Sequence, residues 1–146
     1  MRQMRTGSDE SYVIDLCDRV LRLKGKRQHR LDFLRGDPGK DGRCVRLPVD
    51  AYYEELNLVI EYRETQHSKE HIFFDKPSKL TISGCPRGEQ RRRYDQRRRD
   101  VLGKQLIELD YTLFEHNTQG RLSRNESYDE PVIREKLSAY LRPNVD

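Results

Sequence analysis

The amino-acid sequence predicts an α/β fold, a sandwich in which helices flank a mixed central sheet. Apolar residues recur every three or four positions near both ends of the chain, which is typical of amphipathic helices. Alternating or continuous apolar segments, typical of strands, lie between these ends, and a highly charged helical segment interrupts them. The resulting order is helix, three strands, helix, strand, helix. A length of 146 residues suits one domain with one modest core.

The first half of the chain contains one predicted helix and three predicted strands. Residues 1–10 are expected to form a flexible tail, from which Ser8 or Asp9 caps a helix that reaches about Lys24 and stops at Gly25. The predicted strands are 29–35, Cys44–Tyr53 and Leu56–Arg63, separated by turn-forming residues at 36–42 and at Glu54–Glu55. The last two strands are expected to pair as a hairpin. Nearly continuous Leu, Val and Ile in the third strand favours burial on both faces.

The second half of the chain contains two predicted helices and one predicted strand. A helix is expected from Glu89 to about Leu102, followed by a strand over Leu106–Phe114. Residues 117–129 are polar and are predicted to link a core of residues 11–116 to a C-terminal helix within 130–146. Pro131 suits the first turn of that helix. Its buried stripe would consist of Ile133, Leu137 and Tyr140 or Leu141.

Composition restricts the classes of protein to which the chain can belong. Hydrophobic residues make up 34% of the chain and charged residues 37%, so the core must be thin and the surface densely charged. No apolar stretch reaches the roughly 18 residues of a membrane span, and the first residues lack the apolar region of a secretory signal. We therefore expect a cytoplasmic protein without a membrane partner. Cys17, Cys44 and Cys85 are odd in number and widely spaced, which favours reduced thiols over disulfides or a zinc site.

Positive charge is concentrated in the segment 87–100, which holds seven arginines and three acidic residues. Seven minus three gives +4, which equals the excess of the whole chain, 29 minus 25. Such a patch indicates a polyanionic partner, with nucleic acid, and DNA in particular, as the first candidate. The arginines expected to contact it are Arg91, Arg92, Arg93, Arg98 and Arg99. The alternative is a solvated helix face, with Tyr94, Val101 and Leu102 toward the core and acids four positions away pairing with the arginines.

Two carboxylates lie in predicted strands that otherwise look buried, Asp50 in Cys44–Tyr53 and Glu61 in Leu56–Arg63. A buried carboxylate is costly unless it pairs with a cation or binds a metal ion. Residues on hairpin-linked strands can converge at one end of a sheet, and such oxygen ligands suit Mg²⁺ or Mn²⁺. A metal of this kind can polarise a phosphodiester and activate water. The alternative is a pair of ordinary strand carboxylates held by Arg46 and Arg63.

The segment around these carboxylates resembles the PD-(D/E)XK nuclease superfamily, whose members have a restriction-endonuclease-like fold. It is most similar to the small bacterial domains related to very-short-patch repair endonucleases. In these domains an Asp in one strand is followed by a Val-Glu-Tyr-like strand and then by a His, and Asp50, Glu61 and His67 match that layout. The likeness covers roughly residues 11–115 and includes the arginine-rich helix and the strand at Leu106–Asp110.

The resemblance implies a role for each matching residue. Asp50 and Glu61 would ligate the divalent metal, and the backbone carbonyl of Tyr62 would add a third ligand. His67 or Gln66 would assist the scissile phosphate or the attacking water.

Two further positions complete the implied site. An acid on the first helix, Asp15 or Asp18, is expected to join it. Arg63 stands where the motif has a lysine; arginine is always charged and cannot act as a base, but it can stabilise charge on the phosphorus.

These residues lead to two hypotheses for the function. The first is a metal-dependent nuclease that hydrolyses phosphodiester bonds of nucleic acid, with strong sequence specificity supplied by a partner or by a homodimer. The second is a catalytically inactive nucleic-acid-binding or protein-interaction module on the same fold, because the motif lysine is replaced. Metal-dependent cleavage would separate the two.

Overall fold

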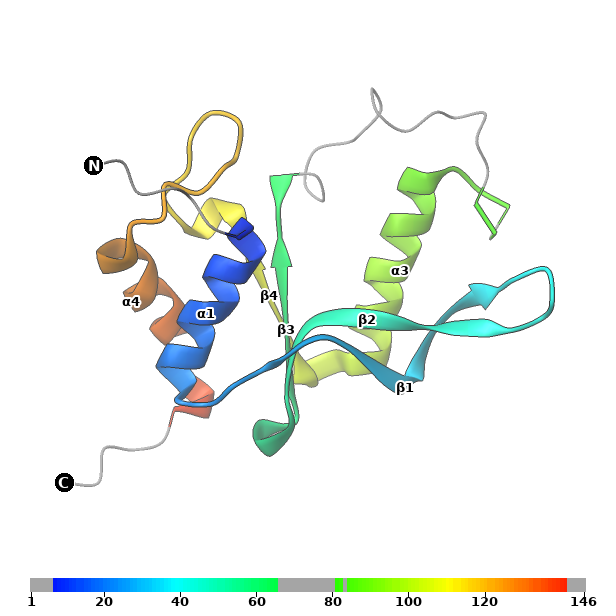
Figure 1. Cartoon of the computed structure of the whole chain (residues 1–146), viewed down its shortest axis with the longest axis horizontal. Coiled ribbons are helices and arrows are strands. Elements are labelled where there is room, and N and C mark those ends of the chain that lie inside the picture. The colour runs from blue at the N-terminus through cyan, green and yellow to red at the C-terminus, as the bar shows by residue number, and fades with distance from the viewer. Residues whose placement is uncertain (1–6, 66–80, 83, 142–146) are drawn as a thin grey trace.

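The computed structural model describes residues 7–65, 81, 82 and 84–141, which form a mixed four-stranded sheet with helices on both faces (Figure 1). The strands are β1 (Lys26–Pro38), β2 (Cys44–Tyr53), β3 (Leu58–Arg63) and β4 (Leu106–Asp110), in that order across the sheet. The helices are α1 (Asp9–Leu21), α3 (Arg87–Leu102) and α4 (Glu126–Lys136). The first three strands are antiparallel neighbours, and β4 is parallel to β3. The predicted α/β class and order of elements are confirmed.

Apolar side chains cover both faces of the sheet. α1 and α4 pack on one face, where Val13 of α1 and Ile133 of α4 join a cluster that includes Ile60 of β3. α3 lies on the other face, where its Leu102 packs with Val59 of β3. Alternating residues of β3 therefore enter different clusters, and the prediction that this strand is buried on both faces is confirmed.

Helix α1 begins as predicted but ends earlier. Ser8 is its N-cap, with an Oγ that accepts the backbone N–H of Ser11 at 3.0 Å. The helix ends at Leu21, because Arg22 adopts a left-handed conformation with φ of 56°. Gly25 is thus not the helix stop that the sequence suggested. Its Cα lies against the ring of Tyr53, and a Cβ there would be 2.8 Å from the ring carbon Cζ.

Strands β1 and β2 form a long ribbon that extends beyond the rest of the sheet and past α3 (Figure 1). β2 has the predicted bounds, whereas β1 is longer than predicted at both ends. Residues 36–38 were expected to be part of a turn, but Pro38 pairs with Cys44, and register shifts on either side of Arg35 accommodate them. The turn itself covers Gly39–Gly42, with Gly42 at φ of 80°.

β4 and the C-terminal part differ from the prediction in extent. β4 ends at Asp110, whose side chain accepts the N–H of Thr112 and starts a 3-10 turn in place of the strand expected to reach Phe114. Residues 117–129 are not simply a linker. Leu122 is fully buried in the core, and the last four residues of the segment belong to α4. α4 begins earlier and ends at Lys136, with Pro131 in its second turn.

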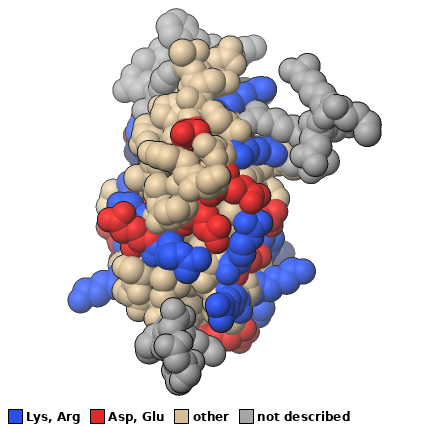
Figure 2. All heavy atoms as spheres, turned by 90° about the vertical axis from the view of Figure 1, so that its left-hand side faces the viewer, with Lys and Arg blue, Asp and Glu red and all other residues tan. Residues whose placement is uncertain are grey.

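The surface formed by α1 and α4 carries acidic and basic side chains in an interspersed arrangement rather than a patch of one sign (Figure 2). All three cysteines are free thiols, of which Cys17 and Cys85 are buried. Among the described residues, no helix combines the length and the apolar character needed to cross a membrane.

Candidate metal centre

The candidate site lies where β2 and β3 separate. The two strands pair at Tyr53 with Leu58, at Tyr52 with Val59 and at Ala51 with Ile60, and this pairing stops there. β3 continues beside β4 as far as Arg63. Beyond Ile60 the edge of β3 that faces β2 is therefore no longer paired with it in a ladder, and a cavity of about 170 Å³ lies beside it.

Asp50 lies at the start of this separation, and its side chain makes a hydrogen bond to β3 in place of the β2 backbone. Its Oδ2 accepts the backbone N–H of Tyr62 at 2.8 Å. In a strand, the N–H and C=O of one residue point to the same edge, so the carbonyl of Tyr62 also faces the cavity side. Asp50 and Tyr62 thus bring a carboxylate and a backbone carbonyl to one side of β3.

Glu61 faces the cavity from β3, and its side chain is only 16% exposed. Its Oε1 is buried and accepts no hydrogen bond from any residue that the structure describes. The Nε of Arg98 faces this oxygen at 3.3 Å, which gives an ion pair without the geometry of a hydrogen bond. A buried carboxylate oxygen without a donor loses its hydration, and the loss is offset only by a cation or a proton.

Glu10, from the first turn of α1, is a further carboxylate of the cavity, which Glu64 and Asp95 also line. The side-chain amide of Gln28 links it to Asp50, donating to Glu10 Oε2 at 2.9 Å and to Asp50 Oδ1 at 3.4 Å. Gln28 lies in the β1–β2 ladder between the pairs of Arg27 with Ala51 and His29 with Val49, which sets it opposite Asp50. The elements α1, β2 and β3 therefore contribute Glu10, Asp50 and Glu61, while Asp95 comes from α3 and Glu64 directly follows β3.

The two acids that the resemblance offered on the first helix, Asp15 and Asp18, lie outside the cavity. Asp18 accepts hydrogen bonds from the hydroxyl of Tyr53 at 2.6 Å and from the backbone of Gly25 at 2.9 Å, and both Asp15 and Asp18 pair with Arg27. These contacts fix the connection from α1 to β1, and neither residue lines the cavity.

The helical spacing could have identified Glu10. It lies three and seven positions before Val13 and Cys17, so it continues the buried stripe of α1 toward the N-terminus. A carboxylate at a position that continues an apolar stripe is expected to point toward the core, which distinguishes Glu10 from the other acids of the helix.

The carboxylates strongly affect one another. Burial raises the pKa of Glu61 to about 9, and the charge of Asp50 and a hydrogen bond with it add to the effect, while Arg98 opposes it. Burial likewise raises the pKa of Glu10 to about 7, again with a contribution from Asp50. At pH 7 Glu61 would therefore keep its proton, whereas Glu10 would be about half ionised. The site has more negative charge than its own cations neutralise, which is the condition under which an added cation binds.

Arg63, at the position of the motif lysine, does not line this cavity. Its guanidinium pairs with Glu108 of β4 at 3.2 Å and with Asp95 of α3 at 3.7 Å. The cation beside Glu61 is Arg98, which also donates to the carbonyl of Pro48 at 3.1 and 3.3 Å. Arg46 pairs with Asp32, so neither arginine named in the alternative interpretation holds Asp50 or Glu61.

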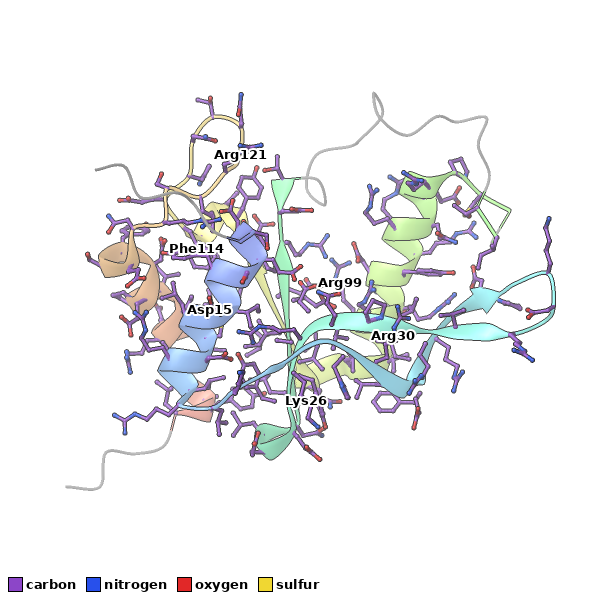
Figure 3. The ribbon with its side chains drawn as sticks, viewed as in Figure 1. Asp15, Lys26, Arg30, Arg99, Phe114 and Arg121 are labelled. Carbon is purple, nitrogen blue, oxygen red and sulfur yellow. The ribbon has the colours of Figure 1, made fainter. Side chains whose placement is uncertain are left out.

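Three consecutive arginines attach α3 to the sheet, because successive helical side chains point in directions about 100° apart. Arg97 pairs with Asp37 of β1 at 2.6 Å, Arg98 points to β2 and β3, and Arg99 pairs with Glu108 of β4 at 2.9 Å. Figure 3 shows the side chain of Arg99 between α3 and the strands. Leu102 is the only fully buried residue of this helix, and Val101, predicted to face the core, is 44% exposed.

Because of this attachment, only some of the arginines predicted to contact nucleic acid lie on the outer surface of α3. Arg98 and Arg99 are turned inward to carboxylates, so neither lies on the outer face of α3, where a polyanion would run along the helix. Arg93 pairs with Glu89 at 2.8 Å on the helix surface, Arg91 is half-buried, and Arg92 is exposed. The arginine run therefore has a structural role in its second half, which the charge count alone did not reveal.

The donor atoms are of the type that a hard divalent cation prefers, but the described side chains are not arranged as a complete binding site. Glu10, Asp50, Glu61 and the carbonyl of Tyr62 supply only oxygen atoms, and one buried oxygen has no hydrogen bond from the described residues. Within 7–65, 81, 82 and 84–141, however, no three His, Cys, Asp or Glu side chains are arranged as a ready metal-binding group. Gln66 and His67, the other predicted site residues, lie outside the described residues.

Comparison of the chain with protein-family models, with curated proteins and with solved structures found no match of any of these kinds.

Proposed function

We propose that the protein is a nuclease with a restriction-endonuclease-like fold that hydrolyses phosphodiester bonds of nucleic acid with Mg²⁺ or Mn²⁺. The observation that carries the proposal is the convergence of Glu10, Asp50 and Glu61 from α1, β2 and β3 on one cavity. The raised pKa values of Glu10 and Glu61 add to it, because burial first and the charge of Asp50 second make ionised carboxylates costly there without a cation. The order of elements and the mixed sheet are compatible with the fold that the sequence resembles.

In this proposal the three carboxylates and the Tyr62 carbonyl hold the metal. When bound, a divalent ion would polarise the scissile phosphate and lower the pKa of a water molecule beside it. Asp50 has a second task, since its hydrogen bond to the Tyr62 backbone fixes that carbonyl relative to its own carboxylate. Gln28 orients Glu10 and Asp50 through its side-chain amide.

Arg98 takes the electrostatic role that the sequence assigned to Arg63. Its guanidinium lies in the cavity with Glu61, held by the carbonyl of Pro48 and by Asp95, so a phosphate that enters meets a fixed positive charge. A preorganised cation of this kind stabilises the charge that develops on the phosphorus in the transition state.

A catalytically inactive module on the same fold is the second candidate, and one observation favours it. Arg98 already pairs with Glu61, and the described carboxylates do not yet form a ready metal-binding group. A chain in which this ion pair replaced the metal would keep the fold but not the activity.

The deciding experiment measures nicking of labelled plasmid DNA with Mg²⁺, Mn²⁺ or EDTA, together with calorimetric titration of Mn²⁺. Asp50→Ala and Glu61→Gln test the ligands, and Glu54→Gln is the matched control because Glu54 is an exposed carboxylate paired with Lys26. We expect metal-dependent nicking in the wild type and the control, and neither nicking nor Mn²⁺ binding in the two ligand variants. A folded wild type that neither binds Mn²⁺ nor nicks DNA would establish the inactive module instead.

A further inference from the structure

The ribbon of β1 and β2 is a second centre of positive charge. Residues 26–53 contain seven Lys and Arg and four Asp, which leaves a net charge of 7 − 4 = +3. Of these, residues 30–46 hold five Lys and Arg and three Asp, which leaves 5 − 3 = +2. We call residues 30–46, the part of the ribbon beyond Gln28, the arm.

Three cations of the arm have no acidic partner among the described residues. Arg30 donates to the carbonyl of Arg46, and Arg35 donates to the carbonyls of Asp32 and Cys44 at 2.8 and 2.9 Å. Lys40 is exposed in the turn. Backbone carbonyls fix the two guanidinium groups across the ribbon without neutralising their charge. This contrasts with Arg97, Arg98 and Arg99 of α3, which all face carboxylates.

α3 holds the arm in place. The hydroxyl of Tyr94 accepts the backbone N–H of Asp37 at 2.9 Å, and Arg97 binds both the Asp37 carboxylate and the carbonyl of Arg35. Gly36 allows this contact, since a Cβ there would lie 2.8 Å from the Tyr94 hydroxyl. A ribbon braced in this way loses little conformational freedom on binding, so its charges are available at small entropic cost.

The arm leads directly away from the candidate metal centre. Its strands are those that carry Gln28 and Asp50, and Arg30 follows Gln28 by two residues (Figure 3). At about 3.3 Å per residue, Arg46 and its ladder partner Arg35 lie roughly 13 Å along β2 from Asp50. That length corresponds to about four base-pair steps of roughly 3.4 Å in B-form DNA.

We propose that the arm enters the major groove of double-stranded DNA and that Arg30, Arg35 and Lys40 bind the phosphates beside the one to be cleaved. The inference rests on the proposed nuclease function and names its substrate as a B-form duplex. The major groove of B-form DNA admits a two-stranded β-ribbon, whereas that of an RNA duplex is deep and narrow. Phe33 and Val45, at 58% and 60% exposure, supply apolar surface on the same ribbon for contact with base edges.

The test is fluorescence anisotropy of a labelled 30-base-pair DNA duplex in EDTA, measured over a series of salt concentrations. The variant combines Arg30→Ala, Arg35→Ala and Lys40→Ala, and the control removes the same charge from the α1 and α4 face through Arg19→Ala, Arg134→Ala and Lys136→Ala. We expect the arm variant to lose at least about tenfold in affinity and about two to three units of the slope of log K against log salt, by roughly 0.9 per phosphate contact. The control should keep most of the wild-type slope.

Three further readings complete the test. A variant with Arg30→Lys and Arg35→Lys keeps the charge and should keep the slope, which excludes loss of fold as the cause. An RNA duplex of the same sequence should compete poorly, and equal competition would overturn the groove assignment. Equal slopes of log K against log salt in the arm variant and its control would overturn the proposed contact between the arm and DNA. If the arm variant loses DNA binding and the wild type cleaves DNA with neither Mg²⁺ nor Mn²⁺, the arm proposal stands and the nuclease proposal fails. If the arm variant binds and cleaves DNA as the wild type does, the nuclease proposal stands and the arm proposal fails.

Discussion

The carboxylate of Asp50 accepts the backbone N–H of Tyr62 at 2.8 Å, at the point where β2 leaves β3. A side chain therefore satisfies a backbone donor that would otherwise be exposed by the separation of the strands. The same bond brings a carboxylate beside the Tyr62 carbonyl, so the opening of the sheet and the construction of the candidate metal centre have one cause.

Substitution of Asp50 should separate its structural role from its electrostatic one. Asp50→Asn retains an oxygen that can accept the Tyr62 N–H, so we expect nearly wild-type stability with loss of Mn²⁺ binding. Asp50→Ala leaves the N–H without its partner and should cost about 1–3 kcal/mol. Urea unfolding at pH 6 in EDTA and Mn²⁺ calorimetry measure the two effects. Equal stability of the two variants would show that the hydrogen bond contributes nothing.

The raised pKa of Glu61 predicts how stability depends on pH in the absence of metal. The ordinary value is 4.5 and the folded value is about 9, so between these limits the unfolded chain ionises while the folded protein keeps its proton. The free energy of unfolding should therefore fall as pH rises through this window, and Glu10 adds to the fall up to about pH 7.

Glu61→Gln removes the titrating group and should flatten this dependence. Urea midpoints at half-unit steps from pH 5 to pH 9 in EDTA measure it, with wild type and variant compared at each step. The difference between the two proteins should grow as pH rises, in favour of the variant. A constant difference across the window would contradict the raised pKa.

Three of the four acids of α1 should respond differently to substitution. Asp18→Ala removes the acceptor of the Tyr53 hydroxyl and of the Gly25 N–H, and we expect a loss of about 2–4 kcal/mol. Asp15→Ala breaks only an exposed ion pair with Arg27 and should cost at most about 0.5 kcal/mol. Glu10→Gln should leave the fold intact and weaken Mn²⁺ binding. Thermal unfolding and calorimetry on the same preparations give both quantities.

Gly120 should be intolerant of a side chain for two separate reasons. Its φ is 81°, and a Cβ would lie 1.7 Å from Oγ1 of Thr65, the last described residue before the segment that contains Gln66 and His67. Gly120→Ala should therefore cost about 2–4 kcal/mol. Gly42→Ala is the matched control, because its φ is 80° but no atom lies within 4 Å of the added Cβ. The control should lose only about 1 kcal/mol in urea unfolding, and equal losses would rule out the contact with Thr65.

The assignment of the phosphate-binding cation to Arg98 predicts unequal effects of two arginine substitutions. Arg98→Lys keeps the charge but loses the fixed guanidinium contacts with Pro48 and Asp95, so plasmid nicking should fall by about 10²-fold or more. Arg63→Lys restores the residue type of the motif, yet this side chain does not line the cavity with Asp50 and is held by Glu108 and Asp95. Nicking by this variant should stay within about threefold of the wild type. A large gain in Arg63→Lys would return the role to Arg63.

Much of the fold could be predicted from local patterns. Cys44–Tyr53 is a strand with its predicted bounds because turn-forming residues enclose an alternating apolar segment, and Ser8 caps the first helix as its side-chain chemistry suggests. The local pattern failed at residues 36–38, which have the composition of a turn. Pairing of Pro38 with Cys44 and the packing of Gly36 on Tyr94 keep them in the ribbon.

The sequence by itself determined the α/β class, the order of the elements and the pair Asp50 and Glu61 as carboxylates in otherwise buried strands. The tertiary structure alone decided which acid of α1 joins them and where each arginine of α3 points. A sequence pattern fixes only the angle of a side chain around its own helix. Which partner stands at that angle depends on how far β2 and β3 separate and on which strand lies opposite, so Glu10 and Arg98 reach the cavity while Asp18 and Arg63 bind elsewhere.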